Sequence, residues 1–199
     1  MKNHREIRAD HDRESIVVYQ AYCSQIADAA LQAGRFVAPF SLQRMTWIKP
    51  SFLWLMERSN WERKTNQERT LAVRITREGW EKALGSAELT NFQRKVHAGG
   101  DDWRRRFKQV PVHVQWDPER SLRGGKLSHR SIQVGITRRM IREFVKDWVV
   151  EIRDLTGLAQ RVRRQLDEGR LDRAKRLLPP ERVVSVDEDI RSRLGMNAL

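Results

Sequence analysis

The segment from Ser15 to Gly34 constrains the fold of this chain more than any other part of the sequence. Its first eight residues, Ser15-Ile16-Val17-Val18-Tyr19-Gln20-Ala21-Tyr22, are rich in β-branched and aromatic side chains and hold no Gly or Pro, which predicts a central β-strand. Apolar side chains then recur at helical spacing as far as Leu31, and Gly34 is a typical helix C-cap. A strand that leads into a helix and a glycine stop predicts a fold in which strands and helices intermix.

Similar patterns continue along the chain. Apolar alternation and β-branched runs predict strands at residues 7–9, 46–48, 68–76, 110–116 and 130–136. Helical spacing predicts helices at residues 51–58, 77–84, 89–96 and 137–148, whereas residues 149–155 fit a helix or a strand. Residues 103–108, 117–120 and 121–129 read as a loop, a turn and a loop. We therefore predict an α+β fold, a single compact domain with a central mixed or antiparallel sheet flanked by helices.

The C-terminal part predicts an appendage to this domain. Residues 158–178 indicate two short basic helices that divide near Gly169, and Pro179-Pro180 ends them. We expect residues 1–157 to form an α+β core domain and residues 158–199 to form a basic helical segment and tail packed on it, within one domain overall.

The charge of the chain favours an anionic partner. Its 199 residues carry 39 Lys and Arg against 26 Asp and Glu, a net charge of +13. Arg side chains match the geometry of phosphates and carboxylates, so a nucleotide or nucleic acid is the first candidate. An Arg-rich composition is also common in high-GC genomes, so the charge alone does not decide between binding and composition.

The same composition bears on the compartment. The one cysteine, Cys23, cannot form an intrachain disulfide and fits a reducing compartment. The first residues carry no apolar run typical of a signal peptide, and no stretch approaches 18 apolar residues. We expect a cytoplasmic protein with no membrane partner.

The Trp-rich stretch from Arg44 to Trp61 holds the strongest signal for a binding site. Lys49-Pro50-Ser51 lies where a short strand gives way to a helix, and Pro is tolerated in the first turn of a helix. Lys49 would then lie beside unpaired helix N–H groups, which is an anion-binding arrangement. Trp47, Trp54 and Trp61 are spaced by seven residues and fit either core packing or a stacking wall for a base or nicotinamide ring.

A second candidate site combines basic and aromatic side chains. The run from Trp103 to Lys108 suits single-stranded nucleic acid, with a solvated loop as the alternative. Its candidate contacts are Arg104, Arg105, Arg106 and Lys108. The arginines of residues 158–178 could follow a phosphate backbone, although the acidic residues among them favour intrahelical pairs. The sequence shows no zinc, Walker A, dinucleotide-glycine or nucleophile-elbow pattern, and we expect no metal site.

Four motifs carry a resemblance to a known family. Val18-Tyr19-Gln20-Ala21-Tyr22, Arg44 to Trp54, Gln115 to Arg120, and Arg130-Ser131-Ile132-Gln133-Val134-Gly135 are similar to the uncharacterised domain-of-unknown-function 4291 family. The resemblance covers about Arg5 to Met196, which is nearly the whole chain. It implies no established activity.

At the level of fold the chain also resembles ADP-ribosyltransferase-like domains. Those open with a strand that carries a His or Arg, followed by a helix and a glycine, and close with a strand that carries a catalytic Glu. Gln20 stands at the first of these places and Gln133 at the second. A Gln cannot act as the acid that orients a ribose and stabilises the oxocarbenium charge. The resemblance therefore implies that Glu119 supplies the acid or that the domain binds a nucleotide without transferring anything.

Two functional hypotheses follow, and the residues leave open whether the chain is an enzyme. The first is a nucleotide-handling domain, with an ADP-ribosyltransferase-like transferase as its enzymatic form and NAD as the candidate cofactor. Its catalytic candidates are Gln20, Gln133 and Glu119, and its ligand-binding candidates are Tyr22, Arg44, Trp47, Lys49, Ser51 and Arg130. Most of these side chains fall at strand ends, where sites tend to lie, so we expect them to line one cleft. The second hypothesis is a non-enzymatic nucleic-acid-binding module that uses Arg104 to Lys108.

Overall fold

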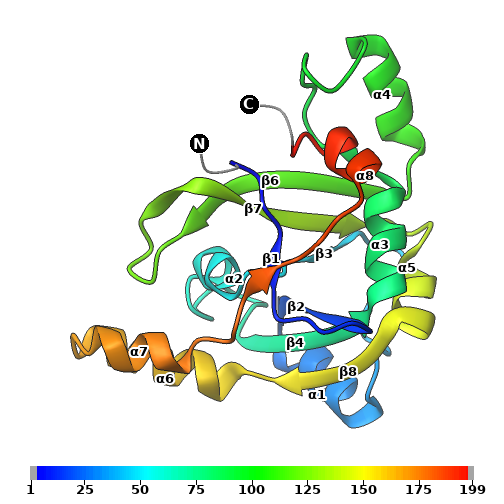
Figure 1. Cartoon of the computed structure of the whole chain (residues 1–199). Coiled ribbons are helices and arrows are strands. Elements are labelled where there is room, and N and C mark those ends of the chain that lie inside the picture. The colour runs from blue at the N-terminus through cyan, green and yellow to red at the C-terminus, as the bar shows by residue number, and fades with distance from the viewer. Residues whose placement is uncertain (1–3, 197–199) are drawn as a thin grey trace.

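Two β-sheets form the centre of the fold in the computed structural model, which describes residues 4–196 (Figure 1). The first of these sheets has the antiparallel order β2 (Ser15–Tyr22), β4 (Arg69–Thr76), β8 (Val149–Asp154). The second has the order β3 (Thr46–Ile48), β7 (Lys126–Ile136), β6 (Val112–Arg120), β5 (Ala87–Leu89), in which β5 and β6 run parallel. A short pair, β1 (Arg8–Ala9) and β9 (Arg182–Val183), lies outside both sheets. The arrangement confirms the predicted α+β class, with mixed and antiparallel sheets flanked by helices in one compact domain.

The two sheets meet where β2 passes β3. The Tyr19 N–H donates to the Lys49 carbonyl at 2.7 Å, and the Lys49 N–H donates to the Tyr19 carbonyl at 3.3 Å. Next to this bridge, side chains make the contacts between the sheets. The Trp47 carbonyl accepts hydrogen bonds from the side chains of Gln20 and Lys49. The junction between the sheets is therefore lined with polar side chains.

The main apolar core lies between the sheets and three helical segments. These are α1 (Ser24–Ala33), α3 (Arg77–Gly85), and α5 (Ile141–Glu143) with the π-helical turn η1 (Phe144–Trp148). Trp80 of α3 is fully buried in this core. Gly79 lets α3 approach η1 closely, because a Cβ at Gly79 would lie 2.4 Å from the Trp148 ring. The absence of a side chain at this position is a packing requirement.

A smaller apolar cluster lies under α2 (Phe52–Ser59), which Figure 1 shows between the two sheets. Phe52, Leu55 and Met56 pack there against Tyr19 of β2 and Ala159 of α6 (Thr156–Asp167). Ser51 caps α2 by accepting from the Trp54 N–H at 3.2 Å. This packing fixes the N-terminus of α2 beside the junction of the sheets.

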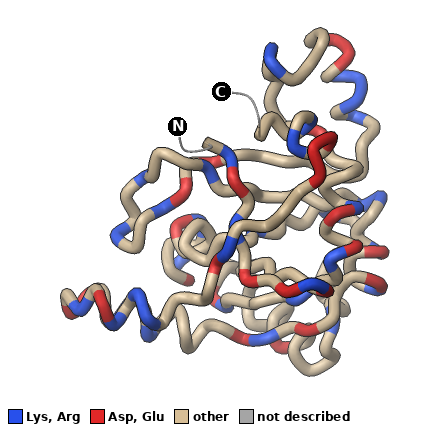
Figure 2. The backbone as a smooth tube through the Cα atoms, in the orientation of Figure 1, with Lys and Arg blue, Asp and Glu red and all other residues tan. Residues whose placement is uncertain are grey.

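The remaining helices lie at the periphery. They are α4 (Gly100–Gln109), α7 (Leu171–Leu177) and α8 (Glu188–Arg193). Helix α4 projects from the top of the molecule in Figure 1, and Figure 2 shows acidic residues at its start and basic residues after them. Basic and acidic residues alternate along α6 and α7. Within residues 4–196, no helix has the length and apolar character needed to cross a bilayer.

Several predicted elements need correction. Residues 103–108 lie within α4, not in a loop, because Gly99 acts as its N-cap and Trp103 and Phe107 pack together at 5.6 Å. The predicted turn and loop at residues 117–129 are mostly strand, because β6 and β7 pair as one long hairpin. The predicted helix at residues 89–96 is wrong, because Leu89 ends β5. Residues 149–154 form strand β8, and the division at residue 157 stays a prediction.

Candidate functional site

Lys49 lies at the centre of the polar junction between the sheets. Its side chain is buried, with 8% exposed, and its ammonium donates to the Trp47 carbonyl at 3.3 Å. Burial, and to a smaller extent the charge of Arg58, lower the pKa of Lys49 from 10.5 to about 8, against the opposing effect of Asp117. An amine with such a pKa can hold or release a proton near neutral pH, as candidate acid–base groups do.

Gln20 and Tyr22 of β2 approach the same junction. The Gln20 amide donates to the Tyr22 hydroxyl at 2.8 Å and to the Thr46 hydroxyl at 2.6 Å, and the two hydroxyls are 2.8 Å apart. Burial raises the pKa of Tyr22, so its hydroxyl stays protonated. The Gln20 Oε1 atom is buried and has no hydrogen-bond partner among residues 4–196. A buried acceptor without a donor is rare in proteins, and a bound ligand or water is one explanation for it.

Asp117 of β6 provides a carboxylate close to Lys49. It accepts from the Gln115 amide at 2.8 Å and from the Gln133 amide at 2.7 Å. Gln115 and Gln133 face each other across β6 and β7, and Lys49 directly follows Ile48, which pairs with Val134. The strand register thus places Lys49, Gln133 and Gln115 in one row on one face of the sheet.

We call this group the Lys49 cluster; its members are Gln20, Thr46, Lys49, Gln115, Asp117 and Gln133. Gln20, Thr46, Lys49 and Gln133 are buried, whereas Gln115 and Asp117 are half-buried. Trp47 is also half-buried beside the cluster, and its ring lies against Gly135, where a Cβ would approach it to 2.9 Å. The cluster therefore combines a buried cation and amides with a more exposed carboxylate and aromatic ring.

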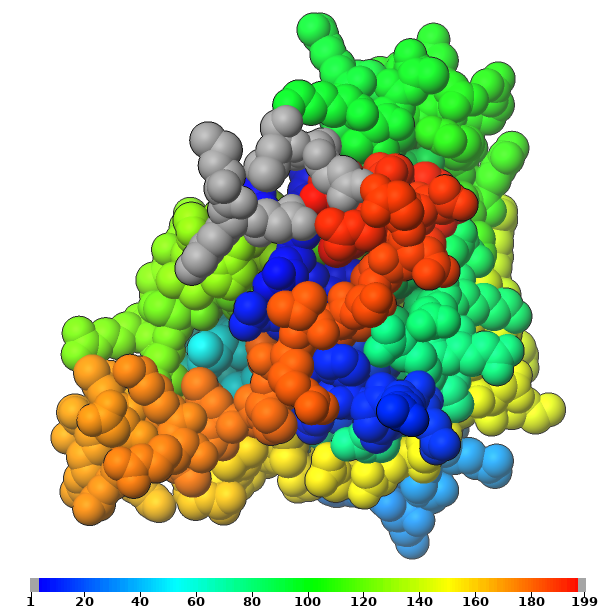
Figure 3. Space-filling model, in the orientation of Figure 1, coloured from blue at the N-terminus to red at the C-terminus, as the bar shows by residue number. Residues whose placement is uncertain are grey.

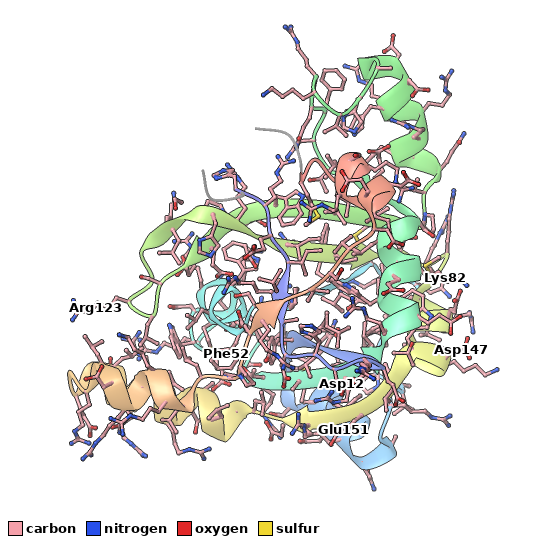
Figure 4. All side chains as sticks on the ribbon, viewed as in Figure 1. Asp12, Phe52, Lys82, Arg123, Asp147 and Glu151 are labelled. Atoms are coloured by element: carbon pink, nitrogen blue, oxygen red, sulfur yellow. The ribbon has the colours of Figure 1, made fainter. Side chains whose placement is uncertain are left out.

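The N-terminus of α2 follows Lys49 closely in the sequence. Two further carboxyl groups, those of Glu119 and Glu181, lie at this helix end. The Ser51 hydroxyl donates to Glu119 Oε1 at 3.0 Å, and the Phe52 N–H donates to Glu181 Oε1 at 2.8 Å. Burial, with a smaller contribution from the charge of Glu119, raises the pKa of Glu181 to about 8, although the hydrogen bond from the Phe52 N–H opposes the shift. Figure 4 labels Phe52 at the start of α2, beside the extended C-terminal segment, which Figure 3 shows crossing the surface in orange. The Glu181 carboxyl group thus occupies the helix-end position where an anion was expected, and its raised pKa keeps it largely protonated near neutral pH.

The structure separates other predicted site residues from the Lys49 cluster. Arg44 is exposed in the loop before β3. Arg130 lies on the opposite face of β7 from Gln133, and its guanidinium donates to the Trp116 carbonyl at 3.1 Å. The expectation that Arg130 and Gln133 line one cleft is therefore wrong for Arg130.

The three tryptophans of the predicted stacking wall each have a different environment. Trp54 is buried in α2, with the Arg120 guanidinium 5.7 Å from its ring centre. Trp61 lies beside Arg163 at 5.8 Å and lines a separate cavity of about 360 Å³. Only Trp47 lies beside the Lys49 cluster. The single stacking wall is replaced by one candidate stacking ring.

The predicted nucleic-acid contacts on α4 are largely engaged within the protein. Arg104 pairs with Asp101 at 2.8 Å and Arg105 with Asp102 at 2.7 Å. Arg106 lies 3.2 Å from Glu88 of β5, and Lys108 is exposed. These pairs reduce the positive charge that the helix presents to an external phosphate.

Four residues of the site were not expected from the sequence. Asp117 was assigned to a turn, Thr46 and Gln115 were read only as parts of strands, and Glu181 follows the Pro179-Pro180 break. A signal existed for Asp117, since it precedes Glu119 by two residues and shares its strand face. No local pattern connects Glu181 with Phe52, because 129 residues separate them.

The sequence that forms this α+β fold, with a buried lysine at the junction of two sheets, matches the model of a known family. The model of the family described as Domain of unknown function (DUF4291) matches residues 6–184. The chain belongs to this family, and the match includes every residue of the Lys49 cluster. A comparison with curated proteins found no match.

Proposed function

We propose that the chain is a nucleotide-handling enzyme whose ligand binds at the Lys49 cluster. The observation that carries this proposal is that Gln20 and the buried Lys49 donate to the same Trp47 carbonyl, while Asp117, which Gln133 holds, acts on Lys49 electrostatically. Burying a lysine and several amides costs stability, and proteins tolerate that cost mainly at functional sites. The half-buried Trp47 ring beside them suits a flat base or nicotinamide ring.

The chemistry proposed for the site is group transfer of the ADP-ribosyltransferase type. In that reaction the bond between C1′ of a ribose and its nicotinamide nitrogen breaks, and nicotinamide leaves with the electron pair. The acceptor then bonds to C1′ and loses a proton. Glu119 or Asp117 would stabilise the positive charge on the ribose, and Lys49 would hold a phosphate.

Gln133 would act in this scheme as a positioning residue. Position 133 holds a Gln where the ADP-ribosyltransferase plan has a catalytic Glu. The Gln133 amide donates to Asp117 and so fixes the position of the Asp117 carboxylate. Tyr22 and Thr46 would hold the Gln20 amide, which leaves the Gln20 Oε1 atom to accept from the ligand. NAD fits this donor set as a substrate, because the cluster offers a cation and the Asp117 carboxylate, with the Trp47 ring and Glu119 beside it.

The first test is thermal unfolding with NAD, with AMP and with a short single-stranded RNA. A ligand at about a hundred times its Kd adds roughly 2.7 kcal/mol, which raises Tm by several degrees. We expect a rise with NAD or AMP that disappears in Lys49→Met. The matched control is Lys95→Met, which removes an exposed lysine and should keep the rise. An equal rise in Lys49→Met would refute binding at this site.

Turnover separates an enzyme from a binding protein. Release of nicotinamide from NAD can be followed by chromatography in the wild type and in Glu119→Gln and Asp117→Asn. We expect at least one of these variants to keep NAD binding and to lose release by about 100-fold or more, because a preorganised charge is worth about that much. NAD binding without release in the wild type would reduce the proposal to nucleotide binding.

The alternative function, a non-enzymatic nucleic-acid-binding module, has less support from the geometry. Arg104, Arg105 and Arg106 are exposed, but each pairs with an acidic side chain, which partly neutralises the charge that α4 offers to a phosphate backbone. A Tm rise with RNA alone that weakens steeply with salt would favour this alternative. We expect either function in the cytoplasm, where the single Cys23 stays reduced.

A further inference from the structure

A second polar cavity lies on the other face of the β6–β7 hairpin. Its volume is about 210 Å³, enough for about seven waters at their liquid volume of about 30 Å³ each. It is lined by Arg5, Leu89, Thr90, Asn91, Gln93, Val114, Trp116 and Arg130. Two of these residues are arginines, and the lining contains no Asp or Glu.

The two arginines are direct neighbours. Arg5 and Arg130 form an isolated parallel bridge, and the Arg130 N–H donates to the His4 carbonyl at 2.8 Å. Burial lowers the pKa of Arg5, and the charge of Arg130 lowers it further. Like charges directly opposite each other on neighbouring strands destabilise a sheet. The two neighbouring guanidinium groups therefore make the cavity more positive, which favours a bound anion.

Arg5 is held rigidly in this position. Its Nη1 atom donates to Gln93 Oε1 at 2.8 Å and lies 3.1 Å from the Gly195 carbonyl, and its guanidinium lies 5.9 Å from the Trp116 ring centre. Gly195 has a positive φ of 65° and touches Arg5 so closely that a Cβ there would lie 2.3 Å from Nη1. Figure 1 shows α8, just before Gly195, lying beside this N-terminal segment. The C-terminal turn thus orients Arg5 before any ligand binds.

Arg130 is oriented in the same manner from the hairpin. Its Nη1 atom donates to the Trp116 carbonyl at 3.1 Å, and its Nε atom donates to His4 Nε2 at 3.1 Å. The neighbouring side chains in the cavity are Thr90, Asn91 and Gln93, which offer hydroxyl and amide donors. Oriented guanidinium groups with neutral donors in the same cavity suit an oxyanion such as phosphate.

We propose that this cavity binds a phosphate group in its dianionic, monoester form. Two fixed guanidinium groups match two negative charges, whereas a phosphodiester carries one. The site lies on the opposite sheet face from the Lys49 cluster, so it does not depend on the function proposed there.

The test is titration of the full chain with inorganic phosphate, followed by the ³¹P linewidth and by Tm at constant ionic strength. Sodium chloride is the control for screening, and dimethyl phosphate is the singly charged diester. We expect inorganic phosphate to raise Tm and to bind at least about tenfold more tightly than dimethyl phosphate, because each charge-assisted hydrogen bond is worth about that factor. Equal effects of phosphate and chloride would overturn the proposal, and equal affinity for the diester would overturn the dianion assignment.

Variants locate the site. Arg130→Lys keeps the charge and loses the guanidinium fork, so phosphate affinity should fall by about tenfold. The phosphate affinity of Arg130→Gln should be lower still. Arg138 is exposed, so the matched control Arg138→Gln should bind phosphate as the wild type does. If Arg130→Gln does not fold, Arg130→Lys alone decides. Wild-type affinity in Arg130→Lys would contradict the assignment of the phosphate to this cavity.

Discussion

Replacement of Lys49 by Met tests whether burial of the charged Lys49 amine lowers the free energy of unfolding. Met has almost the length and volume of the Lys side chain, so the substitution removes the charge without opening a cavity. The pKa of Lys49 falls from its ordinary 10.5 to about 8, because burial outweighs the attraction of Asp117. At about 1.4 kcal/mol for each pKa unit, the buried charge costs about 3 kcal/mol. Loss of the hydrogen bond to the Trp47 carbonyl offsets about 1 kcal/mol of the gain.

We therefore expect Lys49→Met to raise the free energy of unfolding at pH 7 by about 2 kcal/mol. The change of this stability difference with pH depends on how many protons Lys49 binds in the folded and in the unfolded chain. Between pH 8 and pH 10.5 the unfolded chain binds more protons at Lys49 than the folded chain does, so wild-type stability rises with pH in that window. The gain of the variant over the wild type should therefore shrink by about 2 kcal/mol between pH 7 and pH 9.5.

The assay is urea unfolding of both proteins at pH 7 and pH 9.5, with Lys95→Met as the control. Lys95 is exposed, so its loss should change stability by less than about 0.5 kcal/mol. The difference between wild type and Lys49→Met cancels other groups that titrate in this range. A Lys49→Met protein that is less stable at pH 7, with the pH slope of the wild type, would show that Asp117 fully compensates the charge. The argument for a functional lysine would then fail.

Three other perturbations follow from the packing and the caps. Wild-type stability should fall by about 3 kcal/mol between pH 6 and pH 9, because the folded chain holds a proton at Glu181 up to about pH 8 while the unfolded chain loses it near 4.5. Glu181→Gln should remove this loss, as measured by urea unfolding at both pH values. Gly79→Ala should lower the free energy of unfolding by about 2 kcal/mol, since its Cβ would overlap the Trp148 ring; a change below about 0.5 kcal/mol would show that the ring moves aside. Ser51→Ala should lower the free energy of unfolding by about 1 kcal/mol through loss of the α2 cap, as measured by urea unfolding at pH 7.

Local patterns were sufficient for much of the fold. The uninterrupted β-branched run at Ser15–Tyr22 and the glycine stop at Gly34 predicted β2 and α1, because both signals act within a few residues. Lys49-Pro50-Ser51 predicted the end of β3 and the start of α2 for the same reason. The hairpin at residues 117–129 was missed, because pairing between β6 and β7 overrides the turn preference of Asp117-Pro118.

The site was predictable in part. The strand period of two already puts Arg130 on the opposite face from Gln133, so the sequence could have separated them. That Gln20 and Lys49 reach the same carbonyl depends on the tertiary meeting of β2 and β3, which no local pattern specifies. The same is true of Glu181 at the start of α2.

That last contact has a consequence for how the protein is made. Glu181 lies 129 residues after Phe52, so a ribosome synthesises nearly the whole chain before the carboxylate that covers the α2 N-terminus exists. Domains form in the order of synthesis, and contacts of large sequence separation close late. The growing chain can therefore assemble its sheets with the start of α2 exposed. The final C-terminal crossing then closes the strand pair of β1 and β9 and this end of α2 in the same step.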